Sequence, residues 1–315
     1  MSGLRAPFPY FGGKSRVADT VWRAFGDVPN YVEPFAGSLA VLLARPHAAR
    51  HETINDLDCH VANFWRASQA EPEAVAKWAH WPINEADLHA RHLSIVQNEE
   101  FRERMKTDPE HYDVKVAGWW LWGLGAWLGG GWCIAAYGDG RRPSRRIPRP
   151  GEGVHADKLR SHDGQKLTDY MASVKRRIHN TRIICGDWTR ALKHSVTGHH
   201  GTCAIFLDPP YDDGDAAYAA GGQGTVSAQV REWAIENGGS PDLRIALCGY
   251  DGEHGMPSGW RVHQWRAQGG YAHLGDSKGK NNRHRERIWF SPACLPFAAN
   301  ESLFDRLDDE QEGAA

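Results

Sequence analysis

Residues 203–211, CAIFLDPPY, decide the fold prediction because they join an apolar run to a rigid polar turn. Cys203 to Leu207 are small or apolar, which predicts a short buried strand. The two prolines that follow cannot continue a central strand, because neither has an N–H group to donate. The sequence therefore places the carboxylate of Asp208 and the ring of Tyr211 at the carboxyl end of a buried strand, where open α/β sheets bind ligands.

The turn itself, Asp208, Pro209, Pro210 and Tyr211, suits chemistry at an exocyclic amino group. The Asp208 carboxylate and the Pro209 carbonyl can accept the two N–H bonds of such a group. The Tyr211 ring can stack on the ring that carries it. An ordinary strand-ending turn has the same sequence, so the rest of the chain must decide between the two interpretations.

The length of the 315-residue chain allows one large α/β domain with an insertion, or two domains. A net charge of −2 means that any basic surface must be local. The six cysteines show no C-x-x-C pair and no metal-ligand spacing, so no metal is predicted and buried, reduced thiols are expected. There is no signal-peptide pattern and no apolar run long enough to cross a bilayer, and a cytoplasmic protein is expected.

The stretch PFPYFGGKSR at 7–16 combines glycines with a cation. Gly12 and Gly13 allow a ligand to approach the backbone closely, and Lys14 precedes a predicted helix at 17–25. The alternative is a tight turn with a lysine in solvent.

The stretch YVEPFAGSLAVLL at 31–43 predicts a strand, a turn at Gly37 and a helix, and a helix start after such a turn favours an anion. A second strand at 52–56 ends on Asp56, about 20 residues after the turn, where an acid can bind ribose hydroxyls. Asp56 could instead cap a helix at 57–67. A single glycine does not make a dinucleotide fingerprint, which counts against a dehydrogenase.

Residues 71–165 interrupt the α/β pattern and predict an inserted recognition region. Helices are expected at 74–79 and 84–105, before an aromatic and glycine-rich stretch at 119–132. A basic loop follows, and a second lies before the last strand. Their cations are expected to contact phosphates: Arg141, Arg142, Arg145, Arg146, Lys278, Lys280 and Arg283.

The α/β pattern resumes with a helix at 167–179 and a strand at 182–187. This strand ends in Asp187 and Trp188, which could bind an adenine through the carboxylate and the ring, or could form a strand-end turn with a buried indole. Further apolar runs at 244–250, 260–265 and 285–290 raise the number of predicted strands to seven. The acidic tail at 298–315 is expected to be disordered.

Five short motifs occur in a fixed order along the chain: Y-F-G-G-K, E-P-F-A-G-S, N-D, G-D-W and D-P-P-Y. With these motifs the chain resembles the Dam-type DNA adenine-N6 methyltransferases over residues 7–60 and 180–290. The resemblance implies a Rossmann-like α/β sheet that uses S-adenosylmethionine, with seven strands and the last antiparallel. Residues 1–70 and 166–297 would form this catalytic domain, and 71–165 a mainly helical insert that recognises the target. The chain departs from the family at Leu39, where a second glycine or small residue is usual.

The resemblance also implies roles for the matched residues. Asp208 to Tyr211 would hold an adenine flipped out of double-stranded DNA. The S-adenosylmethionine site would comprise Tyr10, Gly12, Gly13, Lys14, Glu33, Phe35, Gly37, Asp56, Asp187, Trp188 and Asp208. The enzyme would act as a monomer of bacterial or phage origin, and a cognate restriction endonuclease is a partner that the family allows.

Three alternatives stay open at this point. The acceptor could be N4 of cytosine, although those enzymes more often carry serine at the position of Asp208. It could be adenine in RNA, because the core motifs do not distinguish the two nucleic acids. The chain could also be a non-catalytic nucleic-acid-binding protein on the same fold.

Overall fold

The computed structural model describes residues 4–8, 13–127, 132–133, 164–211, 225–265 and 285–296. Within these ranges a seven-stranded sheet has the order β3-β2-β1-β4-β5-β7-β6. Its parallel part comprises β1 (Asn30–Glu33), β2 (His51–Asp56), β3 (Arg182–Cys185), β4 (Cys203–Leu207) and β5 (Leu243–Tyr250). The last strand, β7 (Glu286–Phe290), is antiparallel to β5 and to β6 (Arg261–Gln264). The predicted sheet, with seven strands and the last antiparallel, is confirmed.

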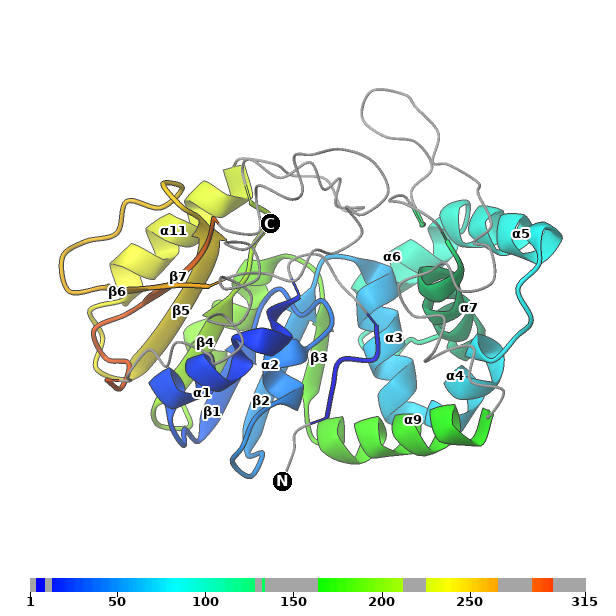
Figure 1. The fold of residues 1–315 in the computed structure, drawn as a ribbon, viewed down its shortest axis with the longest axis horizontal. Helices are drawn as coiled ribbons and strands as arrows, with labels where there is room; N and C mark the ends of the chain where they lie inside the picture. Colours follow the sequence, from blue (N-terminus) through cyan, green and yellow to red (C-terminus); the bar gives the residue numbers. More distant parts are fainter. Residues whose placement is uncertain are drawn as a thin grey trace, which may run out of the picture.

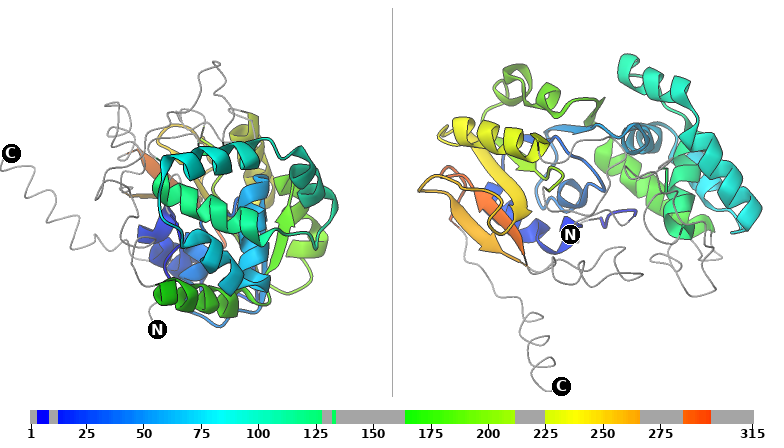
Figure 2. Two further views of the ribbon diagram at one scale, coloured as in Figure 1. Left: turned by 90° about the vertical axis from the view of Figure 1, so that its right-hand side faces the viewer. Right: turned by 90° about the horizontal axis from the view of Figure 1, so that it is seen from above.

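Helices cover both faces of this sheet (Figure 1). Side chains alternate along each strand, so Tyr31 and Phe206 enter one core while Val32 and Ile205 enter the other. The first core is closed by α1 (Ala18–Phe25), α2 (Ala40–Leu43) and α3 (Cys59–Ala70). The second is closed by η2 (Trp188–Leu192), α10 (His194–Thr197) and α11 (Thr225–Asn237). Figure 2 shows α1 and α11 on opposite sides of the sheet.

A group of helices lies beside α3, at the right of Figure 1. It comprises α4 (Pro72–Ala79), α5 (Glu85–Val96), α6 (Glu99–Thr107) and α7 (Val114–Ala126). Of these, α7 packs on α3 and α4, and α9 (Gly164–Ile178) packs on the same two helices. The predicted single helix at 84–105 is wrong. The side chain of Asn98 accepts the N–H of Phe101 at 3.0 Å and starts a new helix there.

Two expectations from composition have structural counterparts. All six cysteines are buried and form no disulfide, as predicted. In the part of the chain that the structure describes, no helix is both long and apolar enough to cross a membrane. The tail at 298–315, which is expected to be disordered, lies outside the described residues.

Candidate active site

The carboxyl ends of the parallel strands meet at one edge of the sheet, and the antiparallel β7 begins at that edge. Asp208 follows β4 directly. Tyr250, the last residue of β5, is paired with Glu286, the first residue of β7. The reversal of β7 therefore brings a carboxyl group from near the end of the chain beside the D-P-P-Y turn.

A buried ammonium group lies at the centre of this edge. Lys14 belongs to the short helix η1 (Lys14–Arg16), and its side chain is 4% exposed. Its Nζ lies 2.9 Å from Oδ1 of Asp208 and 3.9 Å from Oε2 of Glu286. The hydroxyl of Tyr211 lies 2.9 Å from the same Oδ1 and 3.0 Å from the same Oε2. The alternative of a lysine in solvent is wrong.

The charges of this cluster are set by burial and by its own members. Burial alone would lower the pKa of Lys14, but the carboxyl groups of Asp208 and Glu286 outweigh it and hold that pKa above its usual value. Burial and the neighbouring carboxyl groups raise the pKa of Tyr211, which therefore keeps its proton. The ammonium also lies 5.3 Å from the ring centroid of Tyr211, a favourable cation–π distance.

The turn after β1 is fixed by backbone hydrogen bonds to β2. The N–H of Gly37 donates to Oδ2 of Asp56 at 2.9 Å, and the N–H of Ala36 donates to the carbonyl of Asn55 at 2.9 Å. Gly37 has φ of 45° and Leu39 has φ of 54°, so both lie in the left-handed region. Leu39 thus adopts a backbone conformation that favours glycine, and it does so with a fully buried side chain.

Asp56 is half-buried at the end of β2. Its Oδ1 accepts the N–H of Asp58 at 2.9 Å, and the backbone of Leu57 adds a further contact to the carboxylate. A carboxylate has about four acceptor sites, so these three backbone donors leave one for a ligand hydroxyl. Burial, with the nearby charge of Asp58, outweighs these N–H groups and raises the pKa of Asp56 to about 7. Asp58 is the residue that caps α3, through the N–H of His60 at 2.8 Å, so the capping alternative for Asp56 is wrong.

The adenine pocket predicted after β3 has one exposed and one buried member. Asp187 is exposed, and its Oδ1 accepts the N–H of Thr189 at 3.0 Å. Trp188 is 7% exposed and packs in the second core. Its ring lies 6.2 Å from that of Phe35 at 27°, and Phe35 is the half-buried, more open member of this stacked pair.

Glu33 points into the protein from β1. Its Oε2 accepts the hydroxyl of Tyr31 at 2.9 Å, and burial raises its pKa well above the usual range. The carboxyl group is 3% exposed and is therefore held in the core behind the turn.

Several predicted site residues lie outside the described residues. They are Tyr10 and Gly12, together with all the predicted phosphate-binding cations: Arg141, Arg142, Arg145, Arg146, Lys278, Lys280 and Arg283. Gly13 is described and is exposed just before η1.

Sequence reasoning missed two residues of the site. Asn55, 1% exposed, donates from Nδ2 to the carbonyls of Pro34 and Gly186, both at 3.0 Å, and ties together the turns after β1 and β3. Glu286 is the second. The signal available for Glu286 was an acid at the start of an otherwise largely apolar strand, ERIWF, and that for Asn55 was its place beside Asp56 at the end of a predicted strand.

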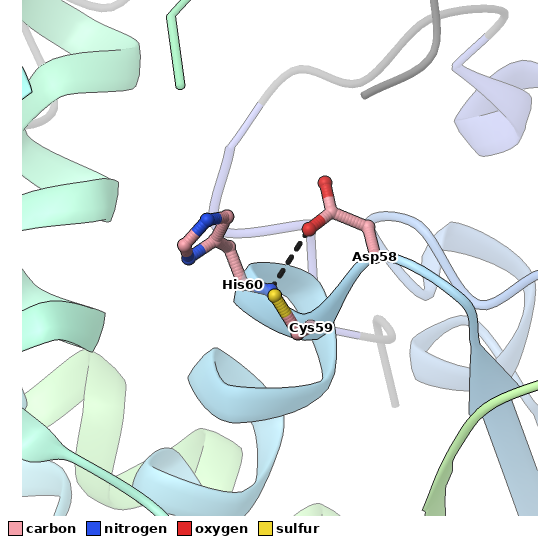
Figure 3. A group of neighbouring side chains, drawn as sticks. All are labelled: Asp58, Cys59 and His60. Carbon is pink, nitrogen blue, oxygen red and sulfur yellow. Dashed lines mark hydrogen bonds between the residues drawn. The ribbon is translucent and has the colours of Figure 1, made fainter. Parts of the chain in front are cut away.

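Asp58, Cys59 and His60 form the one group of potential metal ligands found among the described residues, with donor atoms within 4.8 Å of one another. Figure 3 shows the imidazole on the side of Cys59 away from the Asp58 carboxylate. Asp58 caps α3, and the imidazole stacks on Phe101 at 5.4 Å and 12°. These contacts give the carboxylate and the imidazole structural roles at the start of α3.

The sheet and this edge define a class of protein. The sheet has β7 inserted antiparallel between β5 and β6, an acid at the end of β2 and D-P-P-Y after β4. Together these features define a Rossmann-like methyltransferase fold. Residues 10–105 match the model of the D12 class N6 adenine-specific DNA methyltransferases. No curated protein matches the chain. The predicted resemblance is confirmed, and the protein is an enzyme that methylates N6 of adenine in DNA.

The match to the family model covers some of the predicted site residues and not others. The matched residues include Lys14, the turn at Gly37 and the acid at Asp56, and they end before the D-P-P-Y turn. The class implies S-adenosylmethionine as the methyl donor. The roles of Asp208 and Tyr211 are argued below from their contacts.

Proposed function

We propose that this enzyme methylates an adenine flipped out of double-stranded DNA, and that Asp208, Pro209, Pro210 and Tyr211 receive its amino group. One observation carries the proposal. Both contacts that the described residues make to the Asp208 carboxylate, from Lys14 and Tyr211, fall on Oδ1. The side chain is 20% exposed, so Oδ2 is the oxygen left for an amino group.

The chemistry requires a better nucleophile than adenine N6 in its ground state, because the lone pair of N6 is delocalised into the ring. Hydrogen bonds from its two N–H groups to Oδ2 of Asp208 and to the Pro209 carbonyl favour a pyramidal nitrogen. They also stabilise the positive charge that develops as N6 bonds to the methyl carbon. The prolines hold both acceptors in place before the substrate arrives. Water takes the proton that N6 loses after the transfer.

S-adenosylmethionine supplies an electrophilic methyl group on a sulfonium and leaves as the neutral thioether. The donor groups at this edge fit a nucleoside. Asp56 keeps an acceptor site for a ribose hydroxyl, and Asp187 presents an exposed carboxylate beside the stacked rings of Phe35 and Trp188. The turn at Gly37 and the predicted residues Tyr10, Gly12, Gly13 and Glu33 would shape the rest of the cofactor site.

DNA recognition is assigned to the segment between the two parts of the catalytic domain. Residues 71–165 would recognise the target sequence, and residues 1–70 and 166–297 would carry the chemistry. The amino group of a paired adenine is not accessible to Asp208 inside a duplex, so the base must leave the stack. The arginines and lysines of the two basic loops would bind the backbone.

The test is tritium transfer from labelled S-adenosylmethionine to unmethylated duplex DNA, followed by digestion to nucleosides. We expect label in N6-methyl-2′-deoxyadenosine. Asp208→Ala should lower kcat by about 10²–10³-fold, as when one preorganised electrostatic partner is removed. Asp242→Ala is the matched control, because Asp242 is exposed and precedes β5 at the opposite edge of the sheet.

The alternatives predict other outcomes. Label in cytosine or in RNA would keep the fold and change the substrate. Wild-type rates in Asp208→Ala would remove the proposed amino site. A protein that neither transfers label nor binds the cofactor would be a DNA-binding protein on this fold.

A further inference from the structure

Glu286 is a buried carboxyl group whose presence the fold does not require. It is 4% exposed at the start of β7, in a strand whose remaining core positions are apolar. A buried ionisable group is costly unless it is paired, and well-packed apolar side chains often replace such groups without loss of stability. The contacts of the Glu286 carboxyl group are with Tyr211 and Lys14, both at the candidate active site.

The geometry around the Tyr211 hydroxyl requires an additional proton. This oxygen lies 2.9 Å from Oδ1 of Asp208 and 3.0 Å from Oε2 of Glu286, and both are hydrogen-bond distances. A phenol has one O–H and can donate fully to only one of the two. If both carboxyl groups were ionised, one of the short contacts would join two lone pairs. The arrangement is satisfied when one carboxyl group is protonated and donates to the phenol oxygen.

The position of Lys14 identifies which carboxyl group is protonated. Its ammonium lies 2.9 Å from Asp208 but 3.9 Å from Glu286, so the charge partner of Lys14 is Asp208. With Asp208 ionised and Glu286 neutral, the buried cluster has no net charge. Burial and the Asp208 charge raise the pKa of Glu286, against the opposing effect of Lys14.

The groups that face Glu286 come from several elements. Arg285, just before its strand, lies over the Tyr250 ring, and Arg287, within the strand, pairs with Asp251. The other ionisable groups near its carboxyl come from η1, from the turn after β4, from β5 and from the turn that follows β5: Lys14, Asp208, Tyr211, Cys248, Tyr250 and Glu253. Of these, Lys14 is the one cation.

We propose that Glu286 is a positioning residue that donates its carboxyl proton to the Tyr211 hydroxyl, which in turn donates to Oδ1 of Asp208. This chain, which rests on the proposed function, fixes the Asp208 carboxylate and directs Oδ2 to the amino group. When Glu286 ionises, it competes with Asp208 for the phenol proton and for Lys14. Asp208 then loses its fixed orientation, and methyl transfer slows as the pH rises and Glu286 ionises.

The test compares wild type with Glu286→Gln, whose amide N–H can replace the carboxyl proton but cannot ionise. We expect the variant to keep kcat within about tenfold of wild type, since one hydrogen bond is weakened and not removed. The fall of kcat that accompanies ionisation of Glu286 in the wild type, as the pH rises, should be absent from the variant. A loss of more than a hundredfold, with cofactor binding and the unfolding midpoint unchanged, would mean that ionised Glu286 is required, and would overturn the proposal.

A second readout does not depend on catalysis. Buried Glu33, whose pKa is also raised, should give the C=O stretching band of a protonated carboxyl in the wild type and in the variant. The infrared spectrum of the cofactor-free wild type should contain a further such band from protonated Glu286, and that band should vanish in Glu286→Gln. It should persist in Glu253→Gln, whose carboxylate accepts from the N–H of Tyr250 at 2.8 Å. If no band is lost on changing Glu286, the proton is elsewhere and the proposal fails. This result stands even if the methyl acceptor has been misassigned.

Discussion

Replacing Lys14 by methionine tests whether the active site is held together by a buried charge. The substitution keeps most of the side-chain volume and removes the ammonium that lies 2.9 Å from Asp208. Removing one partner of a buried ion pair typically costs about 3–5 kcal/mol, because the other charge stays buried without compensation. Lys14→Met should therefore lower the free energy of unfolding by about 3–5 kcal/mol. That is a large part of the roughly 5–15 kcal/mol that holds a folded domain together.

The assay is equilibrium unfolding in urea, followed by the fluorescence of the 14 tryptophans. The double variant Lys14→Met/Asp208→Asn removes both charges and should recover about 1–3 kcal/mol, as expected for residues in direct contact. Arg23→Met is the matched control. Its partner is Asp19, the two side chains are 44% and 70% exposed, and such a pair contributes about 0–1 kcal/mol.

The pH dependence of this effect has a definite sign. The folded-state pKa of Lys14 is raised, so its stabilisation is complete below the unfolded-state value of about 10.4 and is lost only as the pH rises through the higher folded value. The deficit of Lys14→Met should therefore be constant between neutral and mildly alkaline pH. A deficit as small as that of Arg23→Met would refute the argument that Lys14 stabilises this edge.

Three further predictions concern the turn after β1 and its contacts with β2 and β3. The pKa of Asp56 is raised to about 7, so cofactor affinity measured by calorimetry should fall by up to about tenfold per pH unit below that value. Asp56→Asn should bind the cofactor weakly and without this pH dependence. A flat wild-type profile would exclude Asp56 as the ribose ligand. Leu39→Gly should lower the free energy of unfolding, measured in urea, by about 1–3 kcal/mol. Loss of a buried leucine costs about 2–5 kcal/mol, and relief of its left-handed backbone returns about 1–2 kcal/mol. A variant more stable than wild type would contradict this balance. Asn55→Ala removes the side-chain donor from the carbonyls of Pro34 and Gly186, so it should lower the free energy of unfolding by about 2–3 kcal/mol and also weaken cofactor binding. An unchanged free energy of unfolding would show that the turns after β1 and β3 keep their positions without Asn55.

The sequence predicted the sheet well because its strands are short apolar runs with clear ends. β4 was placed at its observed bounds, since the prolines after Asp208 end the strand and the strand is buried throughout. The helix at 84–105 was predicted as continuous because its apolar periodicity passes through residues 97 and 98. The polar cap at Asn98, followed by Glu99 and Glu100, was the signal that should have ended it.

The individual residues of the site were more predictable than their contacts. Lys14 and Asp208 were both expected at the site, but the lysine was assigned to the cofactor, and its ion pair with Asp208 depends on how η1 meets β4. Glu286 was missed because its placement depends on strand register. A shift of one residue between β5 and β7 would turn its side chain to the opposite face of the sheet.

The antiparallel direction of β7 explains how a carboxyl group reaches the D-P-P-Y turn without another loop. A parallel strand at this position would present its last residue, Phe290, beside Tyr250, and would place Glu286 at the far edge of the sheet. Reversal brings the first residue of β7 to the edge where Asp208 and Tyr211 lie, within 3.0 Å of the phenol oxygen. The feature that distinguishes this sheet from a fully parallel one thus positions the residue that we propose to orient the catalytic carboxylate. Glu286→Gln, which cannot ionise, therefore tests whether the residue that this antiparallel strand brings to the site orients Asp208.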